Sequence, residues 1–263
     1  MIESREELTA ALRQVEAWEA GQKDLWFWEK LGRLPFEMLD RITPQSIQTK
    51  IGEALGDLGA YVQSGGQYLV SDTSVLKAFQ AKVPDVTFEE IRGLPIRTMD
   101  AVAEEISRRS ALAATAQGAT TGFGGVLTLA IDIPAILGMS LKLIQEIALA
   151  YGYDPREQHE RAFVIKCLQF ASSDIVGKKA ILHELGHYGQ QEAQNQMISQ
   201  LQGWREVFQT YRDNFGWKKL FQLVPVLGMF FGAYVNRSAI QDLAEAGQML
   251  YRKRRILERL QAE

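Results

Sequence analysis

The feature that most limits how this chain can fold is the stretch from residue 110 to residue 141, SALAATAQGATTGFGGVLTLAIDIPAILGMSL, in which Asp132 is the only charge. Small residues recur in it at three- and four-residue spacing, which lets helix backbones approach closely in a soluble core or in a membrane bundle. A second uncharged run, residues 220–236, carries Pro225, Gly228 and Gly232. We therefore expect two Gly-rich apolar helical hairpins at the centre of the fold.

Asp132 and Pro134 bear on whether the first hairpin lies in a soluble core or in lipid. The stretch is long enough to cross a bilayer, which takes ~20 apolar residues, but a carboxylate at mid-bilayer is costly. The sequence favours a buried soluble hairpin, keeps a membrane-touching hairpin as the alternative, and disfavours a true span. In the soluble hairpin, Asp132 is predicted to be the N-cap of a helix that runs from Pro134 to Tyr151 and stops at Gly152.

The rest of the chain has the periodicity of helices. Apolar residues recur three and four apart, and no run alternates as a strand does. Ser4 followed by Glu6 and Glu7 predicts a helix that ends at Gly21, and Thr87 with Glu90 has the spacing of a capping box. We predict an all-α fold in a single domain over residues 1–263, with a helical lead over 1–95 and a core over 96–263.

Composition excludes some classes of protein. A net charge of −3 argues against a nucleic-acid-binding protein, which usually shows a basic excess. The single cysteine, Cys167, excludes an internal disulfide, suits a reducing compartment and is expected in the core. The charged, amphipathic N-terminus lacks the order of a signal peptide. We expect a cytoplasmic protein, with peripheral attachment to the inner face of the cell membrane as an option; the oligomeric state stays open.

Two clusters suit contact with a membrane surface or a partner. Trp26 and Trp28 lie beside cationic residues, a combination typical of a membrane interface. The simpler interpretation is that they pack a short helix onto the core. The basic residues near the C-terminus are expected to form a solvated helix face, or alternatively to contact anionic lipid; they are Arg252, Lys253, Arg254, Arg255 and Arg259.

Two runs resemble the signatures of the EcsC family. The first is GATTGFGGVLTLAIDIPAILGMSLKLIQEIALAYGYDP, and the second is VPVLGMFFGAYVNRSAIQDLAEAGQMLYRKRRIL. The residues that carry the resemblance are Gly118, Gly122, Gly125, Asp132, Pro134, Tyr151, Gly152, Asp154, Pro225, Gly228, Asn236, Tyr251 and Arg252. The resemblance implies a bacterial protein associated with a membrane complex such as an ABC transporter. The family has no settled biochemical activity and supplies no catalytic residues.

Apart from the resemblance, the pentapeptide His183-Glu184-Leu185-Gly186-His187 has the pattern of a zinc hydrolase. Residues four apart share a helix face, so His183 and His187 can reach one Zn²⁺ while Glu184 polarises a bound water. Glu206, nineteen residues after His187, is the candidate third ligand. The alternative is a chance match in which both histidines are hydrogen-bonded surface residues, so Zn²⁺ is a candidate cofactor and enzymatic activity stays undecided.

Other acidic residues have simpler interpretations. Glu104 and Glu105 precede Arg108 and Arg109 at a spacing that predicts surface ion pairs along one helix. Asp154, followed by a proline, is predicted to be the N-cap of the next helix rather than a ligand-binding group. The function that the residues favour is an interaction protein at the membrane, with the zinc-dependent hydrolase as the alternative.

Overall fold

The computed structural model describes residues 3–22, 61, 70, 72–121, 126–172, 175–186 and 237–262. Within these ranges every regular element is an α-helix, which confirms the all-α prediction. No helix in them is both long enough and apolar enough to cross a membrane. The second uncharged run, residues 220–236, lies outside the described residues.

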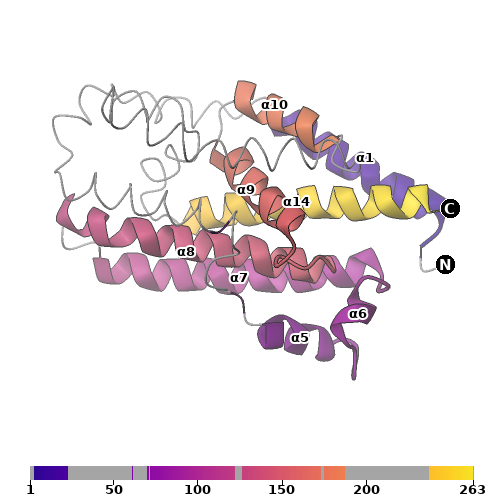
Figure 1. Ribbon diagram of the computed structural model, residues 1–263, viewed down its shortest axis with the longest axis horizontal. Coiled ribbons are helices and arrows are strands. Elements are labelled where there is room, and N and C mark those ends of the chain that lie inside the picture. Colours follow the sequence, from indigo (N-terminus) through magenta and orange to yellow (C-terminus); the bar gives the residue numbers. More distant parts are fainter. Residues whose placement is uncertain are drawn as a thin grey trace.

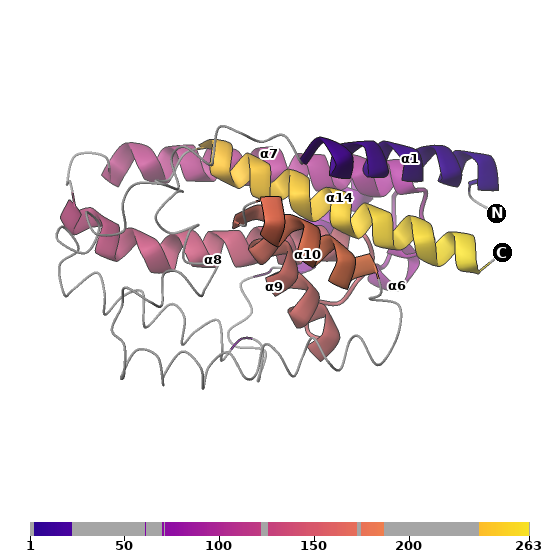
Figure 2. The ribbon, with the colours of Figure 1, turned by 90° about the horizontal axis from the view of Figure 1, so that it is seen from above.

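Two long helices form the centre of the fold, α7 (Ile96–Thr121) and α8 (Val126–Ala150), which lie side by side and antiparallel. The C-terminal helix α14 (Arg237–Gln261) packs against both. The ends of α7 and α8 that adjoin their connection lie at one end of the long axis, and both chain termini lie at the other (Figures 1 and 2). The uncharged stretch is therefore a helical hairpin that points away from the termini.

Shorter helices surround this centre. α1 (Arg5–Gly21) lies along α14, and α9 (Gln158–Ser172) packs on α8 and α14. α10 (Ile175–Gly186) lies on α9, and α5 (Asp72–Gln80) contacts α7 and α8. The single turn of α6 (Phe88–Ile91) precedes α7. The helices share a core in which Val102, Ile147, Phe163 and Tyr251 are fully or almost fully buried.

The predicted N-terminal signals of α1 and α6 are confirmed. The Ser4 hydroxyl accepts the Glu7 N–H at 3.2 Å, and the Glu7 carboxylate accepts the Ser4 N–H at 2.8 Å. Glu90 likewise accepts the backbone N–H of Thr87 at 2.8 Å. Each capping box supplies partners to backbone groups that a helix terminus otherwise leaves unpaired.

The predicted start of α8 is wrong. The helix begins at Val126, so Asp132 and Pro134 lie inside it and Asp132 is not its N-cap. A proline inside a helix removes one backbone hydrogen bond and costs ~3 kcal/mol. A helix of 25 residues accommodates that cost because most of its stability comes from packing along its whole length.

Candidate functional site

The two signature runs meet at the C-terminal end of α8, where α14 packs against residues 151–153; we call this contact the signature junction. The Tyr153 N–H donates to the Ala148 carbonyl at 3.0 Å, and the Gly152 N–H donates to the Leu149 carbonyl at 2.9 Å. Gly152 has a φ of +74°, as the αL residue that ends a helix in this motif requires. The predicted stop at Gly152 is confirmed.

Arg255 of α14 donates hydrogen bonds to the carbonyl groups at this end of α8. Its side chain is 2% exposed, and its Nε and Nη2 atoms donate to the Tyr151 carbonyl at 3.0 and 2.5 Å. Nη2 also reaches the Gly152 carbonyl at 3.3 Å, and Nη1 pairs with Glu258 at 2.8 Å. A buried cation at a helix C-terminus neutralises the partial negative charge of the last carbonyls and supplies them with donors.

Aromatic rings fill the space beside this arginine. The guanidinium carbons of Arg254 and Arg255 lie 4.0 and 4.2 Å from the centroid of the Tyr153 ring. Tyr251 packs against Tyr153 and Phe163, with centroid distances of 5.4 and 4.6 Å. Cations held over ring faces in a buried setting add to the stability of the junction.

Tyr151 joins the junction to α7. Its hydroxyl donates to the Asp100 carboxylate at 2.6 Å, and Arg252 Nε pairs with the other oxygen of that carboxylate at 3.1 Å. Burial raises the pKa of Asp100, although the hydrogen bond from Tyr151 and the charge of Arg252 oppose the rise. Burial also raises the pKa of Tyr151, so this hydroxyl stays a donor.

Glu160 of α9 is a buried carboxylate that pairs with a cation of α14. It is 1% exposed, and its Oε1 atom lies 2.6 Å from Arg254 Nη2 and 3.3 Å from His159 Nε2. Burial by itself would raise the pKa of Glu160, but the hydrogen bond with His159 and the charge of Arg254 outweigh it, so the pKa is lowered. The hydrogen bond with Glu160 raises the pKa of His159.

The prediction that the C-terminal basic cluster forms a solvated helix face is wrong. The side chains of Arg252, Lys253 and Arg254 are 17%, 23% and 15% exposed. Lys253 pairs with Glu19 of α1 at 2.8 Å, and Arg259 pairs with Glu3 and donates to two backbone carbonyls. These cations lie on the face of α14 that meets other helices, so they hold the fold together. Their contact with a membrane or partner stays a prediction.

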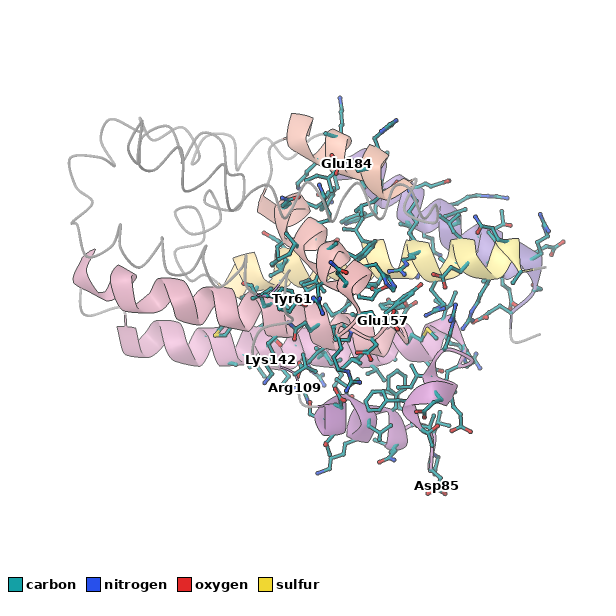
Figure 3. The ribbon with its side chains drawn as sticks, viewed as in Figure 1. Tyr61, Asp85, Arg109, Lys142, Glu157 and Glu184 are labelled. Carbon is teal, nitrogen blue, oxygen red and sulfur yellow. The ribbon has the colours of Figure 1, made fainter. Side chains whose placement is uncertain are left out.

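The HELGH segment is described in part. His183 is exposed on α10, whereas Glu184 Oε2 lies 2.5 Å from Lys166 Nζ of α9 (Figure 3). Within the described ranges no three His, Cys, Asp or Glu side chains gather as a metal site requires. The proposed base Glu184 is thus already in an ion pair, and the three-ligand prediction depends on residues beyond these ranges.

Several predicted site residues lie outside the described residues, so their predictions stay untested. They are Trp26, Trp28, Gly122, Gly125, His187, Glu206, Pro225, Gly228 and Asn236.

Two acidic predictions need correction. Asp154 accepts the Arg156 N–H at 3.0 Å and Arg156 Nε at 2.7 Å, but α9 begins only at Gln158. Asp154 therefore stabilises the turn before the helix and is not its N-cap. Glu105 pairs with Lys82 at 3.8 Å instead of with Arg109, because tertiary neighbours lie closer than the next helical turn.

A cluster of charged side chains around Glu146 of α8 was not predicted from the sequence. The Glu146 side chain is 3% exposed and lies 3.6 Å from Arg109 of α7 and 3.9 Å from Lys142. The Ser74 hydroxyl of α5 donates to the same carboxylate at 3.3 Å. Arg109 and Lys142 lie close together on this part of the hairpin (Figure 3). The sequence did contain one indication of this cluster: Arg109 and Lys142 flank the uncharged stretch, one at each end.

Comparison with known proteins agrees with the signature runs. The model of the EcsC protein family matches residues 9–256. The chain is 56% identical to "Uncharacterized protein YdbA" of Bacillus subtilis (strain 168), over 98% of this chain and 96% of that protein. It is 25% identical to "Protein EcsC" of the same organism, over 90% of each chain. No solved structure matches.

Proposed function

We propose that this chain, which belongs to the EcsC family, is an interaction protein that docks on the inner face of the cell membrane or on a membrane complex such as an ABC transporter. The observation that carries the proposal is the α7–α8 hairpin. Its two helices contain the uncharged stretch and extend to the end of the molecule opposite both termini (Figures 1 and 2). An uncharged helical hairpin that reaches one end of the molecule suits contact with a lipid or membrane-protein surface.

The chemistry of the signature junction also favours an interaction role. Its reactive groups face one another: Tyr151 donates to Asp100, Arg254 pairs with Glu160, and Arg255 binds the end of α8. The first pair joins the end of α8 to the neighbouring helix α7, and the other two join α14 to segments that lie far from it in the sequence. The signatures therefore support an architectural role, in which the junction fixes the hairpin relative to the rest of the protein.

Cell fractionation tests the proposal. The chain should sediment with the membrane fraction and be released by alkaline carbonate, which removes peripheral proteins. Recovery of the chain entirely in the soluble fraction, at native expression level and low ionic strength, would contradict membrane docking by any route.

The zinc-dependent hydrolase is the second candidate, and one observation favours it: His183 is exposed on a helix, where a metal ion has access. Protein purified without an affinity tag should then contain about one zinc per chain. Glu184→Gln should keep the metal and lose hydrolysis, and His187→Ala should lose both. Metal-free protein would remove this candidate and leave the docking proposal intact.

A further inference from the structure

The N-terminal helix α1 is attached to the rest of the molecule mainly through one neighbour. Among the described helices it packs chiefly against α14, and it lies alongside α14 in both views (Figures 1 and 2). The outward face of α1, which includes Arg5, Ala10, Arg13 and Ala17, is exposed to solvent. α14 also packs against α7, α8 and α9. The position of α14 therefore does not depend on α1.

The apolar contact of α1 is small and separate from the main core. Leu8 and Val15 are the two fully buried side chains of α1, and they meet Ile96 of α7 and Ile256 of α14 in a cluster of their own. Elements with few buried apolar contacts open at a lower free energy than the whole protein does. α1 therefore has the structure of an element that can open while the other helices stay folded.

Ion pairs fix the register of α1 on α14. Lys253 Nζ donates to both carboxylate oxygens of Glu19 at 2.8 Å, and Arg259 pairs with Glu3 near the other end of α1. In both pairs α1 supplies the carboxylate and α14 supplies the cation. All four side chains are partly exposed, and such pairs select a partner and its register more than they add stability.

One aromatic contact opposes the release of α1. The Trp18 ring lies 5.6 Å from the Phe170 ring of α9, and Trp18 Nε1 donates to Glu245 of α14 at 2.9 Å. Within the described part of the chain, Trp18 is the only side chain of α1 that packs against the main core. Because this contact holds the last turns of α1, we expect release to begin at the first turns.

α1 fits the surface beneath it as a peptide helix fits a receptor. This surface, the α1-binding face of α14, combines Met249, Ile256 and Leu260 with the cations Lys253 and Arg259. The α1 side chains that meet it recur at the three- and four-residue spacing by which helices anchor in a groove. They are Leu8, Ala11, Leu12 and Val15. Since residues 3–22 contain five glutamates and two arginines, the ligand that fits this face is an acidic amphipathic helix.

We infer that α1 is a removable cover, and that the α1-binding face takes up an acidic amphipathic helix of a partner protein when α1 leaves it. While α1 competes for the face, the apparent affinity for the partner helix falls in proportion to the fraction of molecules in which α1 is released. The inference goes beyond the proposed membrane docking, because it concerns another face of the molecule and does not require the hairpin to meet a membrane.

Binding of a fluorescent peptide with the sequence of residues 3–22 to the full chain tests the inference. The peptide should bind Leu8→Ala with Val15→Ala at least about tenfold more tightly than wild type, because the double variant weakens the competing α1. The matched control, Arg13→Ala with Glu16→Ala, changes two exposed residues of α1 and should stay within about threefold of wild type. Equal affinity of the peptide for all three proteins would overturn the inference.

An exchange of charges tests whether the peptide binds where α1 binds. In the chain with Leu8→Ala and Val15→Ala, the further substitution Lys253→Glu should weaken binding at least about tenfold, because two carboxylates would then face each other. A peptide that carries Glu19→Lys should restore the lost affinity. If each peptide binds both chains equally well, the binding site is elsewhere and the inference is wrong.

Hydrogen exchange of the unaltered chain decides the matter if a variant does not fold. Amides of α1 should exchange faster than those of α7, α8 and α14, and saturating peptide should speed the exchange of α1 further because it displaces α1. Exchange of α1 as slow as that of α14, or exchange that the peptide leaves unchanged, would show that α1 is not a removable cover.

The mass of the wild-type chain in solution tests the assignment to a separate partner. The chain should not form a dimer as its concentration rises. A dimer that the peptide dissociates would make α1 of a second copy the occupant and overturn that assignment. None of these results affects the cell fractionation, so the proposed membrane docking stands or fails independently of them.

Discussion

Replacing Gly152 with alanine should destabilise the protein through two separate effects. The residue has a φ of +74°, a conformation that costs roughly 1–2 kcal/mol for a residue with a Cβ. That Cβ would also lie 3.0 Å from the backbone N and Cα atoms of Arg92, which cannot move away as a side chain could. Overpacking of this kind costs about 1–3 kcal/mol. Alanine also lowers the entropy of the unfolded chain, which returns about 0.4–1 kcal/mol.

The net expectation for Gly152→Ala is a loss of about 1–5 kcal/mol in the free energy of unfolding, measured by urea denaturation. Gly21→Ala is the matched control, because Gly21 is the last residue of α1 and a Cβ there would meet nothing within 4 Å. The control should be neutral or stabilising by up to ~1 kcal/mol. A Gly152→Ala protein as stable as wild type would refute the geometry described for the end of α8.

Three other perturbations probe the same junction. Arg255→Met should cost about 3–5 kcal/mol in chemical denaturation, because it leaves Glu258 and the end of α8 without their buried partner, and Arg255→Lys should recover only part of the loss. Tyr151→Phe should cost about 1–3 kcal/mol, and its effect should add less than fully to that of Asp100→Asn in a double-mutant cycle. The hydrogen bond with Glu160 raises the pKa of His159 above 6.5. The stability from this pair is therefore complete below pH 6.5 and is lost as the pH rises through the folded-state pKa of His159. Thermal unfolding between about pH 5 and 8.5 should show this decrease in stability in wild type and not in His159→Gln.

Local signals in the sequence were sufficient for several helix boundaries. Ser4 with Glu7 and Thr87 with Glu90 act within one helical turn, and Gly152 ends α8 through its own backbone conformation. Such interactions need no knowledge of the tertiary fold. Asp132 looked like the same kind of signal, but packing along a 25-residue helix outweighed the preferences of one aspartate and one proline.

The role of the C-terminal arginines was not predictable in the same way. Arg255 binds the carbonyl of Tyr151, which is 104 residues away in the sequence, and a basic run does not reveal which of its members meets a distant helix end. The Glu146 cluster was missed for a similar reason, because it joins residues from three helices. The charged residues at the ends of the apolar stretch indicated where the cluster lies, but they did not indicate that Glu146 and Ser74 take part in it.

The depth of the hairpin in a bilayer is the most direct measure of the membrane-docking role. Thr121→Cys places a thiol at the end of α7 that adjoins α8, and Glu104→Cys places one at an exposed position seventeen residues earlier in the same helix. Native Cys167 is fully buried and its thiol pKa is raised, so an environment-sensitive fluorophore should react at the introduced cysteine. With phosphatidylglycerol vesicles, the label at residue 121 should shift to the blue and be quenched by brominated acyl chains, while the label at residue 104 should not respond. Identical emission of both labels with and without vesicles would contradict insertion of the α7–α8 hairpin.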